Sequence, residues 1–348
     1  MKTKVVKVGD ILIGGGNPVS IQTMWDKPIY SVDNSLIEKL NDINAAGCDI
    51  IRFAVPKIED ATIIGEIASK ILMPVVADIH FDYKIALKCM DYPIAKIRIN
   101  PGNIGSKWKV EEVIQKAKDK NIPIRIGING GSLPSDLRGS SSISNALITA
   151  AEREMEFFDS HNFNNFLVSL KSSNMEEAYK ANKDFSLKYT NPLHLGITEA
   201  GSLIPAVVKS SIFLYRVLSE GIGDTLRISI SDDPLKEIYA ANEILSALKM
   251  NKRERVELVS CPKCGRASFD THEFNNLIQK KLLTVRKNIT VAIMGCTVNG
   301  PEEAKHADLG ITGSGNSILI FKHGKIIRKV TSDQALKAFE EEIDNFEI

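Results

Sequence analysis

The chain has 348 residues, of which 43% are hydrophobic and 25% are charged, and its formal net charge at pH 7 is +1. These ordinary globular values argue against a strongly basic nucleic-acid binder and against an acidic disordered protein. No apolar run reaches the ~18 residues that a membrane span needs, and the N-terminus lacks the apolar core of a signal peptide, so we expect a cytoplasmic protein.

Short β-branched runs alternate with amphipathic stretches through the first two-thirds of the chain. This alternation predicts parallel strands joined by crossover helices, and eight such units fit a (β/α)₈ TIM barrel of roughly 250 residues. A doubly wound open sheet is the alternative fold. The expected strands are Val19–Met24, Ile50–Val55, Val75–Ile79, Ile94–Ile99, Ile122–Ile128, Asn165–Lys171, Pro192–Thr198 and Leu226–Ser231.

Polar and apolar residues alternate within these strands. In Lys96–Asn100 and Arg125–Asn129 the polar residues share one face and the isoleucines share the other, and Arg52, Asp78 and His80 follow the same pattern. A barrel lumen is normally packed with Val, Ile and Leu, and burying several charges without a ligand is costly. We therefore expect these polar side chains at the C-terminal mouth, where barrel enzymes hold their active sites.

A second, smaller α/β domain is expected after the barrel, which divides the chain into residues 1–250 and 251–348. The last barrel helix is predicted over Asp233–Leu248, and a charged linker follows at Asn251–Glu257. The elements expected beyond it are strands at Val256–Ser260, Ile289–Met294, Ser317–Phe321 and Lys325–Val330 and helices at Thr271–Val285 and Ser332–Phe346.

Three of the five cysteines lie in this second domain. Cys261 and Cys264 form a C-x-x-C knuckle, and Cys296 ends an apolar run. A zinc ribbon would need a second C-x-x-C pair, which the sequence lacks, so we favour a catalytic [4Fe–4S] cluster that keeps one iron open to another ligand. The other two cysteines, Cys48 and Cys89, are interpreted as buried structural thiols. A Cys₃His zinc site stays open as an alternative, with three candidate histidines: His272, His306 and His323.

A carboxylate is the candidate for the remaining cluster ligand. Glu303 lies seven residues after Cys296. A carboxylate is a harder and more weakly held ligand than a thiolate, so a substrate oxygen could displace it. A solvated surface glutamate is the alternative interpretation of Glu303.

With these motifs, the sequence resembles a known enzyme family, the 4-hydroxy-3-methylbut-2-en-1-yl diphosphate synthases of the non-mevalonate isoprenoid pathway. Its bacterial two-domain form matches nearly end to end. The most specific motifs are Cys261-Pro-Lys-Cys264-Gly-Arg, Gly295-Cys296-Thr-Val-Asn-Gly-Pro-Glu-Glu303-Ala, Lys96-Ile-Arg98-Ile-Asn100-Pro-Gly-Asn103 and His194-Leu-Gly196-Ile-Thr198-Glu199-Ala-Gly. One position departs from the family pattern, since Glu302 stands where a glycine usually precedes the liganding glutamate.

The resemblance implies reductive ring opening and dehydration of 2-C-methyl-D-erythritol 2,4-cyclodiphosphate to 4-hydroxy-3-methylbut-2-enyl diphosphate. Two electrons would arrive singly from flavodoxin or ferredoxin through the cluster. Because loss of the substrate oxygen requires protonation, Glu199 is the expected proton donor or hydroxyl partner, with His194, Asp78 and His80 as second choices. The implied cluster ligands are Cys261, Cys264, Cys296 and Glu303. The implied substrate-binding residues are Arg52, Arg98, Arg125, Asn129, Lys171, His194 and Ser229.

Two other classes of protein stay as alternatives. One is a metal-free barrel lyase for a phosphorylated metabolite that carries a zinc-ribbon interaction module. The other is a non-catalytic metal sensor or scaffold, which the polar lumen argues against. Iron and zinc contents after anaerobic purification would separate these classes.

The order of the elements also predicts an assembly. The helix Asp233–Leu248 should return to the bottom of the barrel, whereas the substrate should bind at the top. The linker Asn251–Glu257 spans at most roughly 25 Å. We therefore expect a head-to-tail homodimer in which each cluster domain caps the partner's barrel and the active site is shared between chains. The family's known arrangement is similar.

Overall fold

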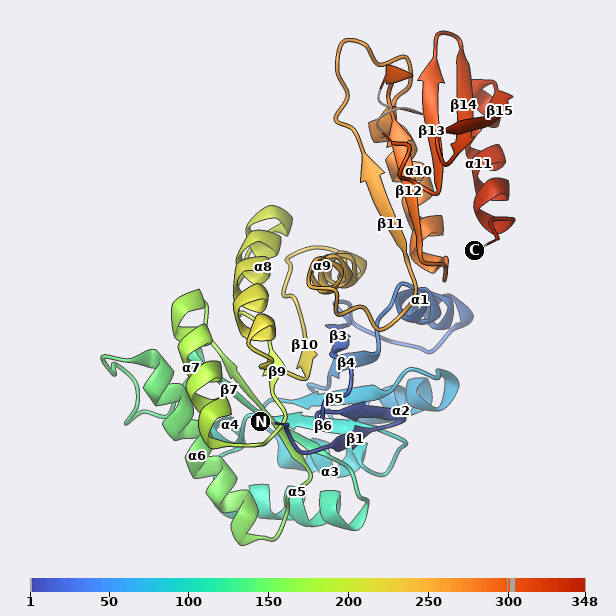
Figure 1. The fold of residues 1–348 in the computed structure, drawn as a ribbon. Coiled ribbons are helices and arrows are strands. Elements are labelled where there is room, and N and C mark those ends of the chain that lie inside the picture. Colours follow the sequence, from blue (N-terminus) through green and yellow to red (C-terminus); the bar gives the residue numbers. More distant parts are fainter. Residues whose placement is uncertain (1, 299, 301–303, 348) are drawn as a thin grey trace. The chain divides into compact units, whose positions relative to one another are not determined.

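The computed structural model describes residues 2–298, 300 and 304–347 (Figure 1). The chain divides into two compact units, Met1–Lys252 and Arg253–Ile348. Each unit has a hydrophobic core of its own. Among the described residues, no helix is long and apolar enough to cross a membrane.

The first unit is a (β/α)₈ barrel, which confirms the expected fold and shows that the doubly wound alternative is wrong. Its eight strands follow the order β8-β7-β6-β5-β4-β3-β10-β9, and a parallel bridge between Val168 and Leu193 joins β8 to β9. The strands are β3 (Ser20–Met24), β4 (Ile50–Ala54), β5 (Val75–Ile79), β6 (Lys96–Ile99), β7 (Ile124–Asn129), β8 (Phe166–Lys171), β9 (His194–Leu195) and β10 (Thr225–Leu226).

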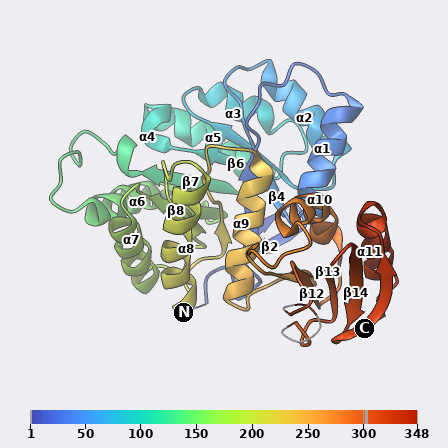
Figure 2. The same ribbon diagram turned by 90° about the horizontal axis from the view of Figure 1, so that it is seen from above.

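Helices surround the barrel (Figure 2). Several of them begin at a side-chain cap, as where the Asp33 carboxylate accepts from the backbone N–H of Leu36, which satisfies a donor that the helix itself leaves free. They are α1 (Asn34–Ala45), α2 (Asp60–Lys70), α3 (Tyr83–Cys89), α4 (Pro101–Ile104), α5 (Lys107–Asp119), α6 (Ile143–Ser160), α7 (Met175–Lys188), α8 (Leu203–Ser219) and α9 (Pro234–Ala247), with a 3₁₀ turn at Gly130–Ser132.

The last two barrel strands are much shorter than the sequence predicts. β9 ends before Gly196, whose φ is +153° and whose Cα lies so close to the next strand that an added Cβ would meet the Arg227 carbonyl oxygen at 2.5 Å. Beyond β10, the backbone N–H of Ile230 donates to the side chain of Glu237 rather than to a neighbouring strand. Both strands therefore end early and turn into loops at the C-terminal mouth.

An N-terminal hairpin that the sequence analysis missed closes the other end of the barrel. Its strands are β1 (Val6–Val8) and β2 (Ile11–Ile13), which pair antiparallel. Three of its side chains form a small apolar cluster with residues near the start of β4, β5 and β8. The cluster consists of Val6, Val8, Ile13, Ile50, Val76 and Leu167.

The second unit is a five-stranded mixed sheet with the order β11-β12-β13-β14-β15. Helices α10 (Thr271–Thr284) and α11 (Ala335–Asp344) pack with it, and a 3₁₀ turn at Ser332–Gln334 precedes α11. The predicted strands are present, and β13 is an addition. β13 contains two glycines, so it lacks the run of β-branched residues by which the other strands were predicted. Gly310 is needed here because an added Cβ would meet the Phe321 ring at 2.1 Å. The strands are β11 (Val256–Ser260), β12 (Ile289–Met294), β13 (Leu309–Ser314), β14 (Ser317–Lys322) and β15 (Lys325–Val330).

The hairpin provides a stability prediction. Ile13 is fully buried under the barrel, whereas Leu12 on the same strand is 46% exposed. We expect Ile13→Ala to lower the unfolding free energy of the barrel by about 2–5 kcal/mol, because it leaves a cavity in the closing cluster. Leu12→Ala should cost less than about 1 kcal/mol. Urea unfolding followed by circular dichroism measures both, and equal losses would show that the hairpin does not close the barrel.

Candidate active site

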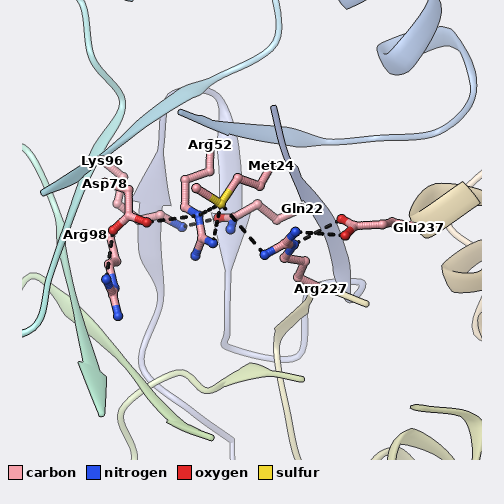
Figure 3. Close-up of polar contacts among 8 residues, drawn as sticks. All are labelled: Gln22, Met24, Arg52, Asp78, Lys96, Arg98, Arg227 and Glu237. Carbon is pink, nitrogen blue, oxygen red and sulfur yellow. Dashed lines mark hydrogen bonds and ion pairs between the residues drawn. The ribbon is translucent and has the colours of Figure 1, made fainter. Parts of the chain in front are cut away.

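Six cationic side chains gather in the barrel lumen, and Figure 3 shows four of them. These lumen cations are Arg52 on β4, Lys96 and Arg98 on β6, Arg125 on β7, Lys171 on β8 and Arg227 directly after β10. All except Arg227 are buried. Among the described residues, the ion pairs of this group use two carboxylates, Asp78 and Glu237. This excess of buried positive charge favours an anionic ligand, and the planar guanidinium groups suit phosphate oxygens.

Asp78 at the end of β5 holds two of the arginines in place. Its carboxylate accepts from Arg98 Nη1 at 2.9 Å and lies 3.5 Å from Arg52 Nε (Figure 3). Burial alone would raise the pKa of Asp78, but Arg52 and Arg98 outweigh burial and lower that pKa to about 2. Asp78 is therefore a charged structural partner of the arginines at neutral pH, which is a different role from the proton donor considered above.

Several buried polar groups in the lumen have no partner within the described chain. Arg125 and His194 are buried almost completely, and Arg125 Nε and Nη1 and both ring nitrogens of His194 make no hydrogen bond. Burial, reinforced by Arg125 and Lys171, lowers the pKa of His194 well below its ordinary value, so the imidazole is neutral at pH 7. Because buried donors without partners are costly, this part of the lumen is suited to hold a polar ligand or water.

Two glycines make room for the cations. An added Cβ at Gly127 on β7 would meet Arg98 Nε at 2.6 Å, and one at Gly196 after β9 would meet Lys171 Nζ at 2.8 Å. The guanidinium of Arg98 and the ammonium of Lys171 thus occupy the space that side chains at these positions would fill. The glycines in the Arg-Ile-Gly and Leu-Gly-Ile patterns are therefore explained by space, because a larger side chain at either position would collide with a cation.

The remaining predicted residues lie around this group at the barrel mouth. Asn129 ends β7 and stands beside Lys171 in the strand register. Ser229 is half-buried in the segment after β10. Glu199 and His80 are exposed in the loops that follow β9 and β5. Glu199 has a left-handed backbone with φ +54°, an uncommon conformation for a residue other than glycine.

Three residues of the site were not singled out from the sequence. Lys96 and Arg227 belong to the alternating polar face, which was the signal that could have found them. Lys96 Nζ donates to Gln22 Oε1 at 3.3 Å, and Arg227 pairs with Glu237 at 2.8 Å. Glu237 lies on helix α9, so the alternation within the strands gives no signal for it.

In the second unit, three cysteines line one cavity of about 200 Å³. The backbone N–H of Gly295 donates to Cys261 Sγ at 3.1 Å, and the backbone N–H of Arg266 lowers the pKa of Cys264. Cys296 completes the lining together with Pro262, Arg266, Ala267 and Gly295. Backbone donors aimed at sulfur favour the thiolate, which is the form that binds metal.

The chemistry of this cavity fits an iron–sulfur cluster. Cys261, Cys264 and Cys296 line one common cavity, and among the described residues no three His, Cys, Asp or Glu side chains form a group that could hold a metal ion as they stand. The part of the lining that the structure describes contains no histidine. Cysteine thiolates around one cavity suit a multi-iron cluster. Glu303 and Glu302 lie outside the described residues.

The other two cysteines differ from these three. Burial raises the pKa of Cys48 and of Cys89 to about 12. Both lie in the barrel core, so they are inert structural thiols, as the sequence analysis expected.

Comparison with known proteins identifies relatives over nearly the whole chain. Residues 3–242 match the GcpE TIM-barrel domain and residues 257–345 match the GcpE protein C-terminal domain. A 4-hydroxy-3-methylbut-2-en-1-yl diphosphate synthase (flavodoxin) from Treponema denticola is 47% identical, covering 95% of this chain and 93% of its own. A protein of the same name from Clostridium tetani is 44% identical, covering 99% of each chain.

A solved structure shares the barrel fold. Dihydropteroate synthase from Thermus thermophilus superposes with a TM-score of 0.53 at 13% identity, over 71% of this chain and 98% of its own. At that identity the likeness concerns the fold alone.

The ion pairs of Asp78 lead to a pH-dependent prediction. Asp78→Asn should cost about 3–5 kcal/mol of unfolding free energy, because it leaves two buried arginines without their shared carboxylate. The carboxyl has a pKa of about 2 in the folded chain and about 3.9 when unfolded, so its charge stabilises the fold above about pH 4. That contribution is lost as the pH falls toward about 2.

Urea unfolding of both proteins across this range measures the effect. The difference between wild type and Asp78→Asn should be constant above about pH 5 and should narrow by about 2 kcal/mol below about pH 4. A difference that stays constant down to about pH 2 would contradict the assigned ion pairs.

Proposed function

Because the chain belongs to the 4-hydroxy-3-methylbut-2-en-1-yl diphosphate synthase family, we propose that it converts 2-C-methyl-D-erythritol 2,4-cyclodiphosphate to 4-hydroxy-3-methylbut-2-enyl diphosphate. Two electrons and two protons enter, one ring C–O bond breaks, and one oxygen leaves as water. Flavodoxin is the electron donor, as in the names of the relatives, and ferredoxin is the alternative. The observation that supports this function best is the group of lumen cations, whose excess charge matches a diphosphate.

The barrel residues have distinct roles in this proposal. Arg52, Arg98, Arg125 and Lys171 bind the diphosphate, because their donors are preorganised by burial and by Asp78. The neutral residues Asn129, His194 and Ser229 add hydrogen bonds to the substrate. A diphosphate would give the unpartnered donors of Arg125 the acceptors that the chain does not supply.

Glu199 is the proposed proton donor. Loss of a hydroxyl as water requires a proton at the leaving oxygen, and a carboxylic acid at the mouth can supply it. The left-handed backbone at Glu199 supports this role, since strained backbone gathers at functional sites.

Cys261, Cys264 and Cys296 are the proposed ligands of a [4Fe–4S] cluster. Their common cavity and the N–H donors at the sulfur atoms support this assignment. Glu303, which lies outside the described residues, is the proposed fourth ligand on the strength of the family resemblance. When bound, the cluster would deliver electrons to the substrate one at a time.

The proposed assembly is a head-to-tail homodimer in the cytoplasm with active sites shared between chains. Helix α9 follows the last barrel strand, so the chain leaves the barrel at the end opposite to the mouth. An apolar stripe on α8 supports association with a second copy. Ile204, Val208, Ile212 and Tyr215 follow one helical face and are each about half-exposed or more.

Anaerobic purification with the cluster in place tests the function. The full-length protein should contain about four irons per chain and should form 4-hydroxy-3-methylbut-2-enyl diphosphate with reduced flavodoxin. Cys264→Ser should lose the iron and the turnover while the barrel stays folded. Cys89→Ala, which changes a thiol outside the cavity, is the matched control and should keep its iron. One zinc and no iron in the wild-type protein would refute the assignment.

Subunit mixing tests the shared site. Arg125→Ala damages the barrel and Cys264→Ser damages the cluster domain, so each variant should be nearly inactive alone. In a shared-site heterodimer both lesions fall in one site and the other site is intact. Random exchange of equal amounts should therefore restore about a quarter of wild-type activity. If labelled subunits exchange and the mixture stays inactive, each site is built within one chain.

A further inference from the structure

Glu237 is a buried carboxylate on the first turn of α9, and only 3% of the residue is exposed. Both of its oxygens are fully used. Oε2 accepts from Thr23 Oγ1 at 2.6 Å and from Arg227 Nε at 3.0 Å. Oε1 accepts from Arg227 Nη2 at 2.8 Å and from the backbone N–H of Ile230 at 3.2 Å. One helical side chain thus connects β3 with the segment that follows β10.

The pair with Arg227 is bidentate, so it fixes the plane of the guanidinium as well as its position. The remaining nitrogen, Arg227 Nη1, lies 3.8 Å from Met24 Sδ. The same sulfur lies 2.7 Å from Arg52 Nη2 (Figure 3). Glu237 therefore holds the side chain of Arg227 on the side of the lumen where Arg52 also lies.

Met24 lies between the guanidinium groups of Arg52 and Arg227 and leaves both positive charges available to an anion. A thioether is a weak and neutral acceptor, so Met24 does not neutralise Arg52 or Arg227. Glu237 approaches Arg227 from the α9 side, whereas Met24 and Arg52 lie on the opposite side of the guanidinium (Figure 3). The carboxylate thus anchors Arg227 and leaves Nη1 directed toward the lumen.

We propose that Glu237 is a positioning residue, which orients Arg227 as a further cation for the substrate diphosphate beside Arg52. This inference rests on the proposed function. The charge of Glu237 and its positioning role have opposite effects on binding. By charge alone, a carboxylate near the site repels a diphosphate, so its removal should tighten binding. By positioning, its removal should weaken binding.

A double-mutant cycle on the cluster-loaded, full-length protein tests the inference, with calorimetric binding of 2-C-methyl-D-erythritol 2,4-cyclodiphosphate as the readout. Glu237→Gln should raise the Kd about tenfold, because the amide cannot accept both guanidinium donors. In the Arg227→Ala background, Glu237→Gln should change the Kd less than about twofold, because Glu237 acts through Arg227. An unchanged or lower Kd in the single variant, or equal losses in both backgrounds, would overturn the inference.

Asp224→Asn is the matched control. Asp224 is also a buried carboxylate, and it accepts from Thr3 Oγ1 and from the backbone N–H of Leu193, before β10 begins. Its replacement should lower stability and leave the Kd unchanged. If Glu237→Gln does not fold, Arg227→Lys tests the same ion pair by changing the arginine instead of the carboxylate. Lysine keeps the charge but lacks the planar fork, so the Kd should again rise about tenfold, and an unchanged Kd would overturn the inference.

Binding to the wild-type protein separates this inference from the proposed function. Wild-type protein that binds no cyclodiphosphate would refute the function and the inference with it. Wild-type protein that binds the cyclodiphosphate, with no loss in Glu237→Gln, would refute the positioning role alone.

Discussion

The excess of buried positive charge inside the barrel is the constraint on which the rest of the site depends. Cations taken out of water are costly unless they are paired or await an anion. Side chains next to the cations lower this free-energy cost. Asp78 pairs two arginines, Glu237 pairs a third, and Met24 separates two guanidinium groups with a neutral acceptor. Gly127 and Gly196 leave the space that the side chains of Arg98 and Lys171 occupy.

The chain divides its chemistry between two units of different construction. The barrel supplies rigid strand ends for binding an anion, and its core is independent of the second unit's core. The second unit supplies thiols on turns, where backbone N–H groups can reach sulfur. Each unit therefore performs one task in the proposed reaction: the barrel binds the anion and the second unit delivers the electrons.

Much of this arrangement could be predicted from sequence because strands impose a period of two. Alternation in Arg125–Asn129 revealed both the strand and its polar face. The close spacing of Cys261 and Cys264 pointed to two of the three thiols that line one cavity. The hairpin at Val6–Ile13 was missed because it is short and its purpose depends on barrel ends that are distant in sequence. Glu237 was missed for a related reason. Its importance comes from contacts with Thr23 and Arg227, and a pattern within one helix carries no information about them.

Among the described residues, the N-terminal hairpin covers one end of the barrel with apolar side chains. With Val8 and Ile13 sealing one end of the barrel, substrate and product share the opening at the other end. Both are diphosphates, so under the proposed function the same lumen cations bind the substrate and then the product. In the proposed reaction, the product must then leave through this opening before the next substrate can bind.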